Sequence, residues 1–263
     1  MQLQNLSDSQ IEENQVKELN RLSVSYNKML ERLSEAFKIQ RQFTENAAHE
    51  LRTPLSLMQI QLDLYNSGKH PGNDADTIQT IKMVTEQNER LSKMVKTLLD
   101  MSELQTVGRD ETIVVNALVD EVLADLEPLA QEKNIKLIGK CKDVNMVGSD
   151  ILIYRLVYNL VENAIKYNHS GGQVIVEAYQ KEKQVYLSVE DTGSGIPEEL
   201  KERVFEPFFR VDKSRSRELG GVGLGLALVN EIVRVHDGSI AIRPNPSGGT
   251  IIEVQFAVSR TTA

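Results

Sequence analysis

The chain has 263 residues, a formal net charge of −8 at pH 7 and no tryptophan. This length allows one large domain or two ordinary ones, and the acidic balance argues against a nucleic-acid-binding protein, which usually carries a basic face. The single cysteine, Cys141, can form neither an internal disulfide nor a cysteine-based zinc site, so we expect a reducing compartment. The sequence has no apolar run long enough to span a bilayer and no signal-peptide pattern, which predicts a soluble, cytoplasmic chain.

Residues from about 10 to 66 predict one very long helix. The stretch contains no glycine and one proline, Pro54, and its apolar residues recur three and four positions apart, which forms a single stripe. Such a helix would extend about 80 Å, too far to pack against one globular core, so we expect a coiled coil or a bundle. The stripe consists of Leu19, Leu22, Tyr26, Met29, Leu33, Ala36, Phe43, Ala47, Leu51, Leu55, Met58 and Leu62.

A second helix is expected after the turn-rich segment 67–74, which holds two glycines and a proline. Its apolar positions continue from Ile78 to Leu99, and residues 105–111 are predicted to be a linker. Two antiparallel helices joined by a short turn bury only one face each. We therefore expect a homodimer in which two hairpins form a four-helix bundle.

The remainder of the chain predicts a mixed sheet with helices on one face. Alternating or continuous apolar runs indicate strands at 112–116, 135–140, 145–148, 173–180, 183–191, 239–244 and 250–258. Helical patterns cover 117–133, 150–168 and 224–238.

His49 is the first candidate reactive group. It lies off the apolar stripe of the long helix, so it should face solvent or a partner, with a ring nitrogen free to attack. Glu50 could accept the other ring N–H, although adjacent helical residues do not naturally face each other, and Thr53 lies one turn further on the same face. Pro54 cannot donate to the carbonyl of Glu50, so the helix should bend there. Taken alone, His49 would be interpreted as an ordinary surface histidine.

The helix at 150–168 carries an unusual polar row. Asn159 and Asn163 are spaced four residues apart on one face, and Lys166 follows a turn later. Amides in so apolar a helix are costly unless something polar binds there. An asparagine oxygen can ligate Mg²⁺ and the lysine can meet a phosphate.

Two glycine clusters add to this site. In DTGSGI (191–196), Asp191 could accept a hydrogen bond from an exocyclic amine, while Gly193 and Gly195 would let the backbone approach a flat ring. The segment 220–229 runs a second cluster into a helix N-terminus, where phosphates bind readily. Neither cluster matches the Walker or dinucleotide pattern. The basic stretch 210–219 is either a lid over phosphates or a solvated loop; its cations are Arg210, Lys213, Arg215 and Arg217.

These motifs, in this order, closely resemble the sensor histidine kinases of two-component systems from about residue 14 to 258. HELRTP (49–54) is similar to their H-box, NLVENAIKY (159–167) to the N-box and DTGSGI to the first glycine box. FEPFFRVD (205–212) is similar to the F-box, GVGLGL (221–226) to the second glycine box and SGGT (247–250) to a third. Val222 departs from the threonine or serine that often stands in the second box, and the third box is contracted.

The resemblance implies an ATP- and Mg²⁺-dependent protein-histidine kinase that phosphorylates its own His49 and passes the phosphoryl group to an aspartate of a response regulator. It implies Glu50 as acid/base partner and Thr53 as the residue that assists dephosphorylation of the regulator. Asn163 would hold Mg²⁺, Tyr167 would flank the adenine and Arg210 would steady the γ-phosphate. The other nucleotide-binding positions implied are Asn159, Lys166, Asp191, Gly193, Gly195, Ile196, Lys213, Gly221, Gly223, Leu224, Gly225 and Thr250.

The same resemblance implies four regions. Residues 1–35 resemble the end of a HAMP linker, which predicts that the full-length protein is a membrane receptor joined through a transmembrane segment absent here. Residues 36–104 would be the dimerisation and phosphotransfer hairpin, 105–111 a linker, and 112–259 an α/β-sandwich ATP-binding domain of the Bergerat type.

Two alternatives stay open. An ATPase-driven clamp of the gyrase or Hsp90 type has a catalytic glutamate where this chain has Asn159; Glu162 lies three residues on and is interpreted as structural. A non-catalytic scaffold would not need Asn163, Asp191 and Gly223 to be intact.

Overall fold

The computed structural model describes residues 17–66, 74–104, 106–211 and 221–258. The chain divides into two compact units, residues 1–87 and 88–263, and each is described by itself. None of the helices in these ranges combines the length and the apolar character needed to cross a membrane.

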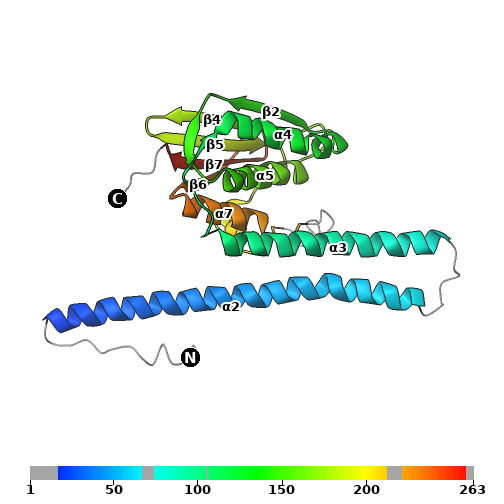
Figure 1. Ribbon diagram of the computed structural model, residues 1–263, viewed down its shortest axis with the longest axis horizontal. Helices are drawn as coiled ribbons and strands as arrows, with labels where there is room; N and C mark the ends of the chain where they lie inside the picture. The colour runs from blue at the N-terminus through cyan, green and yellow to red at the C-terminus, as the bar shows by residue number, and fades with distance from the viewer. Residues whose placement is uncertain (1–16, 67–73, 105, 212–220, 259–263) are drawn as a thin grey trace. The chain divides into compact units, whose positions relative to one another are not determined.

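The first unit contains the expected helical hairpin. Helix α2 runs unbroken from Lys17 to Asn66, and α3 begins at Asp74 and continues to Glu103 in the second unit. A contact of 3.4 Å between the hydroxyls of Tyr65 and Thr77 joins the two helices beside the turn. Figure 1 shows that the last part of α2 turns slightly from the line of the rest, as the proline at position 54 predicts.

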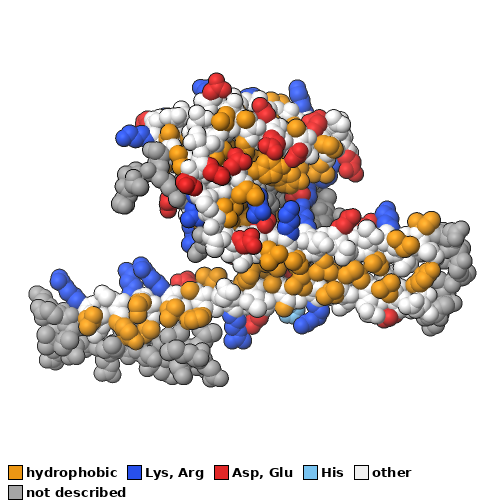
Figure 2. All heavy atoms as spheres, in the orientation of Figure 1, with side chains coloured by type: hydrophobic (Ala, Val, Ile, Leu, Met, Phe, Trp, Pro, Cys, Tyr) orange, Lys and Arg blue, Asp and Glu red, His pale blue; other side chains and the backbone are white. Residues whose placement is uncertain are grey.

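Most of the apolar stripe of α2 is uncovered within a single chain. The side chains of Leu22, Met29 and Leu55 are more than half exposed, and Figure 2 shows apolar side chains gathered along the hairpin. Isolated hairpins do not leave such surface in water without a partner. Exposed apolar residues of this unit are Leu22, Val24, Met29, Leu33, Phe37, Ile39, Leu55, Leu57, Ile60, Leu62, Leu64, Ile78, Ile81 and Met83.

The second unit is the expected mixture of strands and helices. After residues 88–103 of α3 come β1 (Glu111–Val114), α4 (Val115–Glu132), β2 (Lys136–Cys141), β3 (Asn145–Gly148) and α5 (Asp150–Lys166). Then follow β4 (Gln173–Lys181), β5 (Gln184–Asp191), the short 3₁₀ helices η1 (Glu198–Leu200) and η2 (Arg203–Phe205), α7 (Gly225–Val235), β6 (Ser239–Pro244) and β7 (Thr250–Ala257).

Five strands form one mixed sheet in the order β2-β4-β5-β7-β6, in which only the β2–β4 pair is parallel. Strand β4 alternates buried and half-buried residues, so one face of the sheet packs inward. Helices α4, α5 and α7 cover that face (Figure 1), and the apolar core lies between the two layers. The predicted architecture of sheet and helices is therefore confirmed.

The expected strand at 112–116 differs in detail. β1 does not join the main sheet but pairs with β3 in a separate two-stranded sheet. It ends at Val114, and the fully buried Val115, whose N–H donates to the carbonyl of Val144, already begins α4.

Helix α5 is amphipathic in a way that positions the site. Its inner face is fully buried, as shown by Leu152, Leu156 and Leu160, each at most 1% exposed. Its other face carries polar side chains over about three turns, from Arg155 to Lys166. The packing of the apolar face fixes the direction of the polar one.

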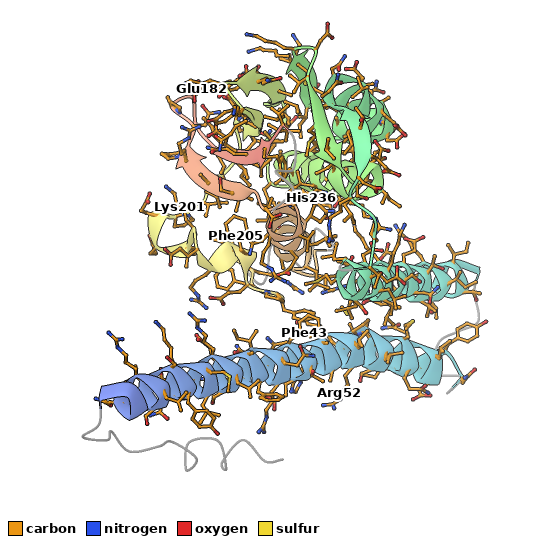
Figure 3. All side chains as sticks on the ribbon, turned by 60° about the vertical axis from the view of Figure 1, so that its left-hand side comes forward. Phe43, Arg52, Glu182, Lys201, Phe205 and His236 are labelled. Carbon is orange, nitrogen blue, oxygen red and sulfur yellow. The ribbon has the colours of Figure 1, made fainter. Side chains whose placement is uncertain are left out.

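His236, at the C-terminal end of α7, joins three elements through a buried ring (Figure 3). Its Nε2 accepts the N–H of Ser149 at 3.1 Å, and its Nδ1 lies 2.9 Å from the carbonyl of Ile232. Nδ1 must therefore carry the proton, and the imidazole is neutral. The ring also packs edge-on against Phe256 of β7. It ties the start of α5 to the end of α7.

Replacing His236 with leucine should destabilise the second unit by about 1–3 kcal/mol, because the buried N–H of Ser149 would lose its acceptor. His169→Leu is the matched control, since His169 is exposed and should change the free energy of unfolding by no more than about 0.5 kcal/mol. Urea unfolding monitored by circular dichroism measures both. Equal losses in the two variants would contradict the assigned role.

Candidate functional site

The second unit contains a cleft formed by two adjoining hollows. One is polar and the other, of about 300 Å³, is mainly apolar. Both are bounded by α5, by the segment around Phe209 and by the start of α7. The side chains shared by the two hollows are Asn163, Tyr167, Val204, Phe209, Arg210 and Leu226. The two hollows therefore form one elongated cleft with a polar and an apolar end.

Asp191, the last residue of β5, lies in the apolar end. Burial raises the pKa of its carboxyl group, although the backbone N–H groups of Gly193 and Thr250 oppose the shift. These N–H groups donate to the same oxygen, Oδ1, at 2.8 and 3.3 Å. These two bonds fix the carboxylate at the lining of the cleft. Among described residues no hydrogen bond to its second oxygen is found.

Glycines around Asp191 permit an unusually close approach of backbone segments. A Cβ on Gly193 would lie 2.4 Å from the carbonyl oxygen of Tyr167, and one on Gly249 would lie 2.2 Å from that of Asp191. Gly249 also has a φ of +90°, which L side chains rarely adopt. Gly195, Ile196 and Thr250 complete the apolar end.

The polar end lies where the second glycine cluster enters α7. Gly221, Gly223, Leu224 and Gly225 line it, and the helix starts at Gly225. Free N–H groups at a helix N-terminus attract anions. The amide of Asn159 donates through Nδ2 to the carbonyl of Arg155 at 2.7 Å, which points its oxygen toward the loop. A Cβ on Gly225 would lie 2.9 Å from that oxygen, so a larger residue would require the amide of Asn159 to shift.

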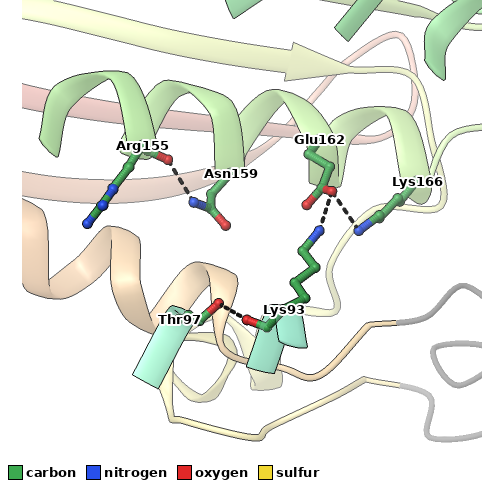
Figure 4. Close-up of polar contacts among 6 residues, drawn as sticks. All are labelled: Lys93, Thr97, Arg155, Asn159, Glu162 and Lys166. Atoms are coloured by element: carbon green, nitrogen blue, oxygen red, sulfur yellow. Dashed lines mark hydrogen bonds and ion pairs between the residues drawn. The ribbon is translucent and has the colours of Figure 1, made fainter. Parts of the chain in front are cut away.

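Three charges meet beside this loop (Figure 4). Oε1 of Glu162 contacts Nζ of Lys166 at 3.0 Å and Nζ of Lys93, from α3, at 2.5 Å. Burial alone would raise the pKa of Glu162, but the two lysines outweigh it and hold that pKa below its ordinary value. Burial lowers the pKa of Lys166 despite the stabilising carboxylate. The cluster carries a net charge of +1, which suits an anionic ligand.

The segment before residue 211 is fixed against the glycine loop. The N–H of Phe208 donates to the carbonyl of Gly223 at 2.7 Å, and Nη2 of Arg210 donates to the carbonyl of Val222 at 3.2 Å. A Cβ on Gly223 would lie 2.7 Å from the carbonyl of Phe209. Arg210 is thereby held at the junction of the two hollows. Lys213 and the rest of the predicted lid lie outside the described residues.

His49 belongs to the first unit. Its side chain is exposed, as the position off the stripe predicts, and Glu50 is half-buried. Thr53 lies on the same face, because its hydroxyl donates to the carbonyl of His49 at 3.2 Å. This bond leaves the hydroxyl oxygen able to accept a hydrogen bond.

Sequence reasoning missed Lys93 and Thr97, which line the polar end of the cleft from α3. Both stand between apolar positions of an amphipathic helix, where a lysine is usually a solvated surface residue. No spacing signal connects them to residues about seventy positions later.

The fold and cleft define the class of ATPase domain described as histidine kinase-, DNA gyrase B- and HSP90-like, which matches residues 148–260. The family described as the His Kinase A (phospho-acceptor) domain matches residues 39–107. The combination of the two places the chain in the sensor histidine kinases of two-component systems.

Individual relatives agree with this assignment. Sensor protein CutS of Streptomyces coelicolor is 35% identical over 247 residues, which cover 92% of this chain and 58% of CutS. The signal transduction histidine-protein kinase ArlS of Staphylococcus aureus is 33% identical over 248 residues, which cover 91% of this chain and 53% of ArlS. The chain thus spans a little more than half the length of these relatives.

Among solved structures, histidine kinase ThkA in complex with response regulator protein TrrA has the same fold. The TM-score is 0.70 at 24% identity, covering 93% of this chain and 68% of that chain.

Gly248 and Gly249 provide a matched test of the close approach at Asp191. Gly248 has a φ of +95° and Gly249 one of +90°, but a Cβ on Gly248 would meet nothing within 4 Å. Gly248→Ala should therefore cost only the backbone strain, about 1–2 kcal/mol. Gly249→Ala should cost clearly more, because the carbonyl of Asp191 must move. Unfolding free energies of the two variants measure the difference, and equal costs would contradict the inference.

Proposed function

We propose that this chain is the kinase portion of a sensor histidine kinase: it binds Mg²⁺-ATP in the cleft of the second unit and transfers the γ-phosphoryl group to His49. The observation that carries the proposal is the cleft itself. A fixed carboxylate stands in its apolar end, and cations and a helix N-terminus stand in its polar end. This polarity matches a nucleotide, whose base is flat and apolar and whose tail is anionic.

The adenine belongs at the apolar end. The second oxygen of Asp191 would accept the exocyclic amine, and Tyr167 would flank the ring. Gly193, Gly195 and Ile196 allow the base to lie against the backbone, and Thr250 fixes the carboxylate through its N–H. A buried, preoriented acceptor strongly disfavours a base that presents a carbonyl at the same place.

The triphosphate belongs at the polar end. Lys166 and the loop of Gly221, Gly223, Leu224 and Gly225 would contact its oxygens, and Lys213 is a further proposed phosphate-binding residue. Arg210 would neutralise the γ-phosphoryl group. Asn163 and Asn159 offer amide oxygens, which suit Mg²⁺, an ion that also takes ligands from phosphates and waters. The metal would supply charge neutralisation along the tail.

At the phosphoacceptor, a ring nitrogen of His49 would attack the γ-phosphorus in line and displace ADP. Catalysis of this kind depends on positioning and charge neutralisation more than on covalent chemistry. Glu50 would accept a hydrogen bond from the N–H of the other ring nitrogen and so increase the nucleophilicity of the attacking nitrogen. Thr53, on the same helical face, would orient water for phosphatase action on the regulator.

The phosphoryl group would then pass to an aspartate on the receiver domain of a cognate response regulator. ThkA, which has the same fold, was solved in complex with the response regulator TrrA. The uncovered apolar face of the hairpin supports a homodimer. In this proposal residues 1–35 are the end of a HAMP-like linker and 36–104 the dimerisation and phosphotransfer hairpin. Residues 105–111 are a second linker and 112–259 the ATP-binding domain. The full-length protein would lie at the cell membrane.

The rival ATPase clamp is disfavoured by the environment of Glu162. A water-activating base needs a carboxylate near the reacting phosphate that can accept a proton. Two lysines occupy the near oxygen of Glu162 and lower its pKa. The amide of Asn159 cannot serve as a base. Hydrolysis without a phosphohistidine is thus the poorer interpretation.

Asp191→Asn tests the adenine end. Because Oδ1 is fixed by two backbone N–H groups, the new amide nitrogen would take the outer position and oppose the amine of adenine. ATP affinity should fall about ten- to a hundredfold, whereas GTP, with a carbonyl there, should lose less or gain. Calorimetric titration with both nucleotides measures the ratio. Unchanged ATP affinity would contradict the assignment.

His49→Gln tests the phosphoacceptor. Incubation of the wild type with γ-labelled ATP should give an acid-labile, base-stable phosphoprotein, and this variant should give none, because no ring nitrogen remains to accept the group. His169→Gln, an exposed histidine of the second unit, should label as the wild type does. Label retained in the His49 variant would show that another residue is phosphorylated.

A further inference from the structure

Lys93 connects helix α3 to the polar end of the cleft. Its ammonium lies 2.5 Å from Oε1 of Glu162, and it lines the same hollow as Asn159, Lys166 and the glycine loop. Lys166 shares that oxygen at 3.0 Å. Glu162 and Lys166 are both nearly buried, with side chains 10% and 16% exposed, but Lys93 is 52% exposed. Lys93 is therefore the most exposed member of the cluster.

A second ion pair fixes how α3 lies on α5. Asp100 contacts Arg155 at 2.9 Å, with both side chains at most one quarter exposed. Lys93 and Asp100 are seven residues apart on α3, and Arg155 and Glu162 are seven apart on α5, so each pair lies on one helical face. Along each of the two helices the cation precedes the carboxylate, so both pairs can form only when the helices run in opposite directions. This pattern selects an antiparallel alignment in which Lys93 reaches the cleft.

We propose that Lys93 is an additional binding cation for the nucleotide's polyphosphate, contributed by helix α3. The inference rests on the proposed nucleotide site. Two ammonium groups and one carboxylate give the cluster a net charge of +1. A polyphosphate would place negative charge beside it. Lys93, the most exposed of the three side chains, would then turn to the phosphates, and Glu162 would remain paired with Lys166. The added negative charge strengthens the attraction that holds Lys93 at the cleft.

Linkage makes this effect reciprocal. If the polyphosphate favours the position of Lys93 in the cleft, then Lys93 raises the affinity for the polyphosphate by the same factor. The gain must grow with phosphate charge and vanish for a nucleoside. A purely structural role of the same ion pair would affect base and phosphate binding alike, which gives a clear distinction.

The test compares Lys93→Met with the wild type in calorimetric titrations with Mg²⁺ and three probes: a non-hydrolysable ATP analogue, ADP and adenosine. Affinity for the ATP analogue should fall about fivefold, that for ADP less, and that for adenosine not at all. The variant keeps its fold because Lys166 still pairs with Glu162. Lys96→Met, an exposed lysine of the same helix outside the cleft, is the charge-matched control and should behave as the wild type. Lys93→Arg should restore the affinity.

Each outcome decides the matter. Equal affinity of Lys93→Met and wild type for the ATP analogue would overturn the inference, as would an equal loss for adenosine or an equal effect of Lys96→Met. A wild type that binds none of the probes would overturn the proposed function itself, and this inference with it. A loss graded from the ATP analogue to adenosine, in this variant alone, would support it.

Discussion

The carboxylate of Glu162 is the constraint around which the site is built. A nearly buried negative charge is stable only when cations hold it, since desolvation otherwise exceeds what the fold can supply. Lys166 and Lys93 both meet this requirement, and their joint effect is visible in the lowered pKa of the carboxyl group. Because Glu162 needs only one of the two, the other is available to a ligand. The stability of the helix and its capacity to bind an anion thus depend on the same three side chains.

Helix α5 allows that arrangement because its two faces have different tasks. Its apolar face is packed so completely that the helix cannot rotate or slide without opening the core. The ring of His236 holds its first turn, and the ammonium of Lys133 donates to the carbonyl of Lys166 at its last. A polar row on so rigid a support presents its groups at fixed positions. Preorganisation of this kind is what phosphoryl transfer requires, because the chemistry depends on placement.

Most of the helices and strands could be predicted from the sequence, because each follows from a local pattern of apolar residues. Strict alternation marked β4 and β5, and the spacing of apolar residues marked α2, α5 and α7. The pairing of β1 with β3 could not be foreseen, because four-residue strands carry no register signal of their own. The residues around Asp191 were identifiable since glycines must stand where backbones approach closely. The close packing of Gly249 against Asp191 was not, because it depends on two loops nearly sixty residues apart.

Lys93 illustrates what local patterns cannot provide. The sequence led to the interpretation of Glu162 as structural, but one of the two lysines that pair with it lies on another helix, in a position typical of a solvated lysine. That helix is continuous from Asp74 to Glu103, whereas the boundary between the two compact units falls at Gln87. The second half of this unbroken helix therefore carries Lys93, which lines the cleft, and its first half belongs to the hairpin. If Lys93 binds the polyphosphate as proposed, the ligand therefore contacts an element that is shared with the hairpin.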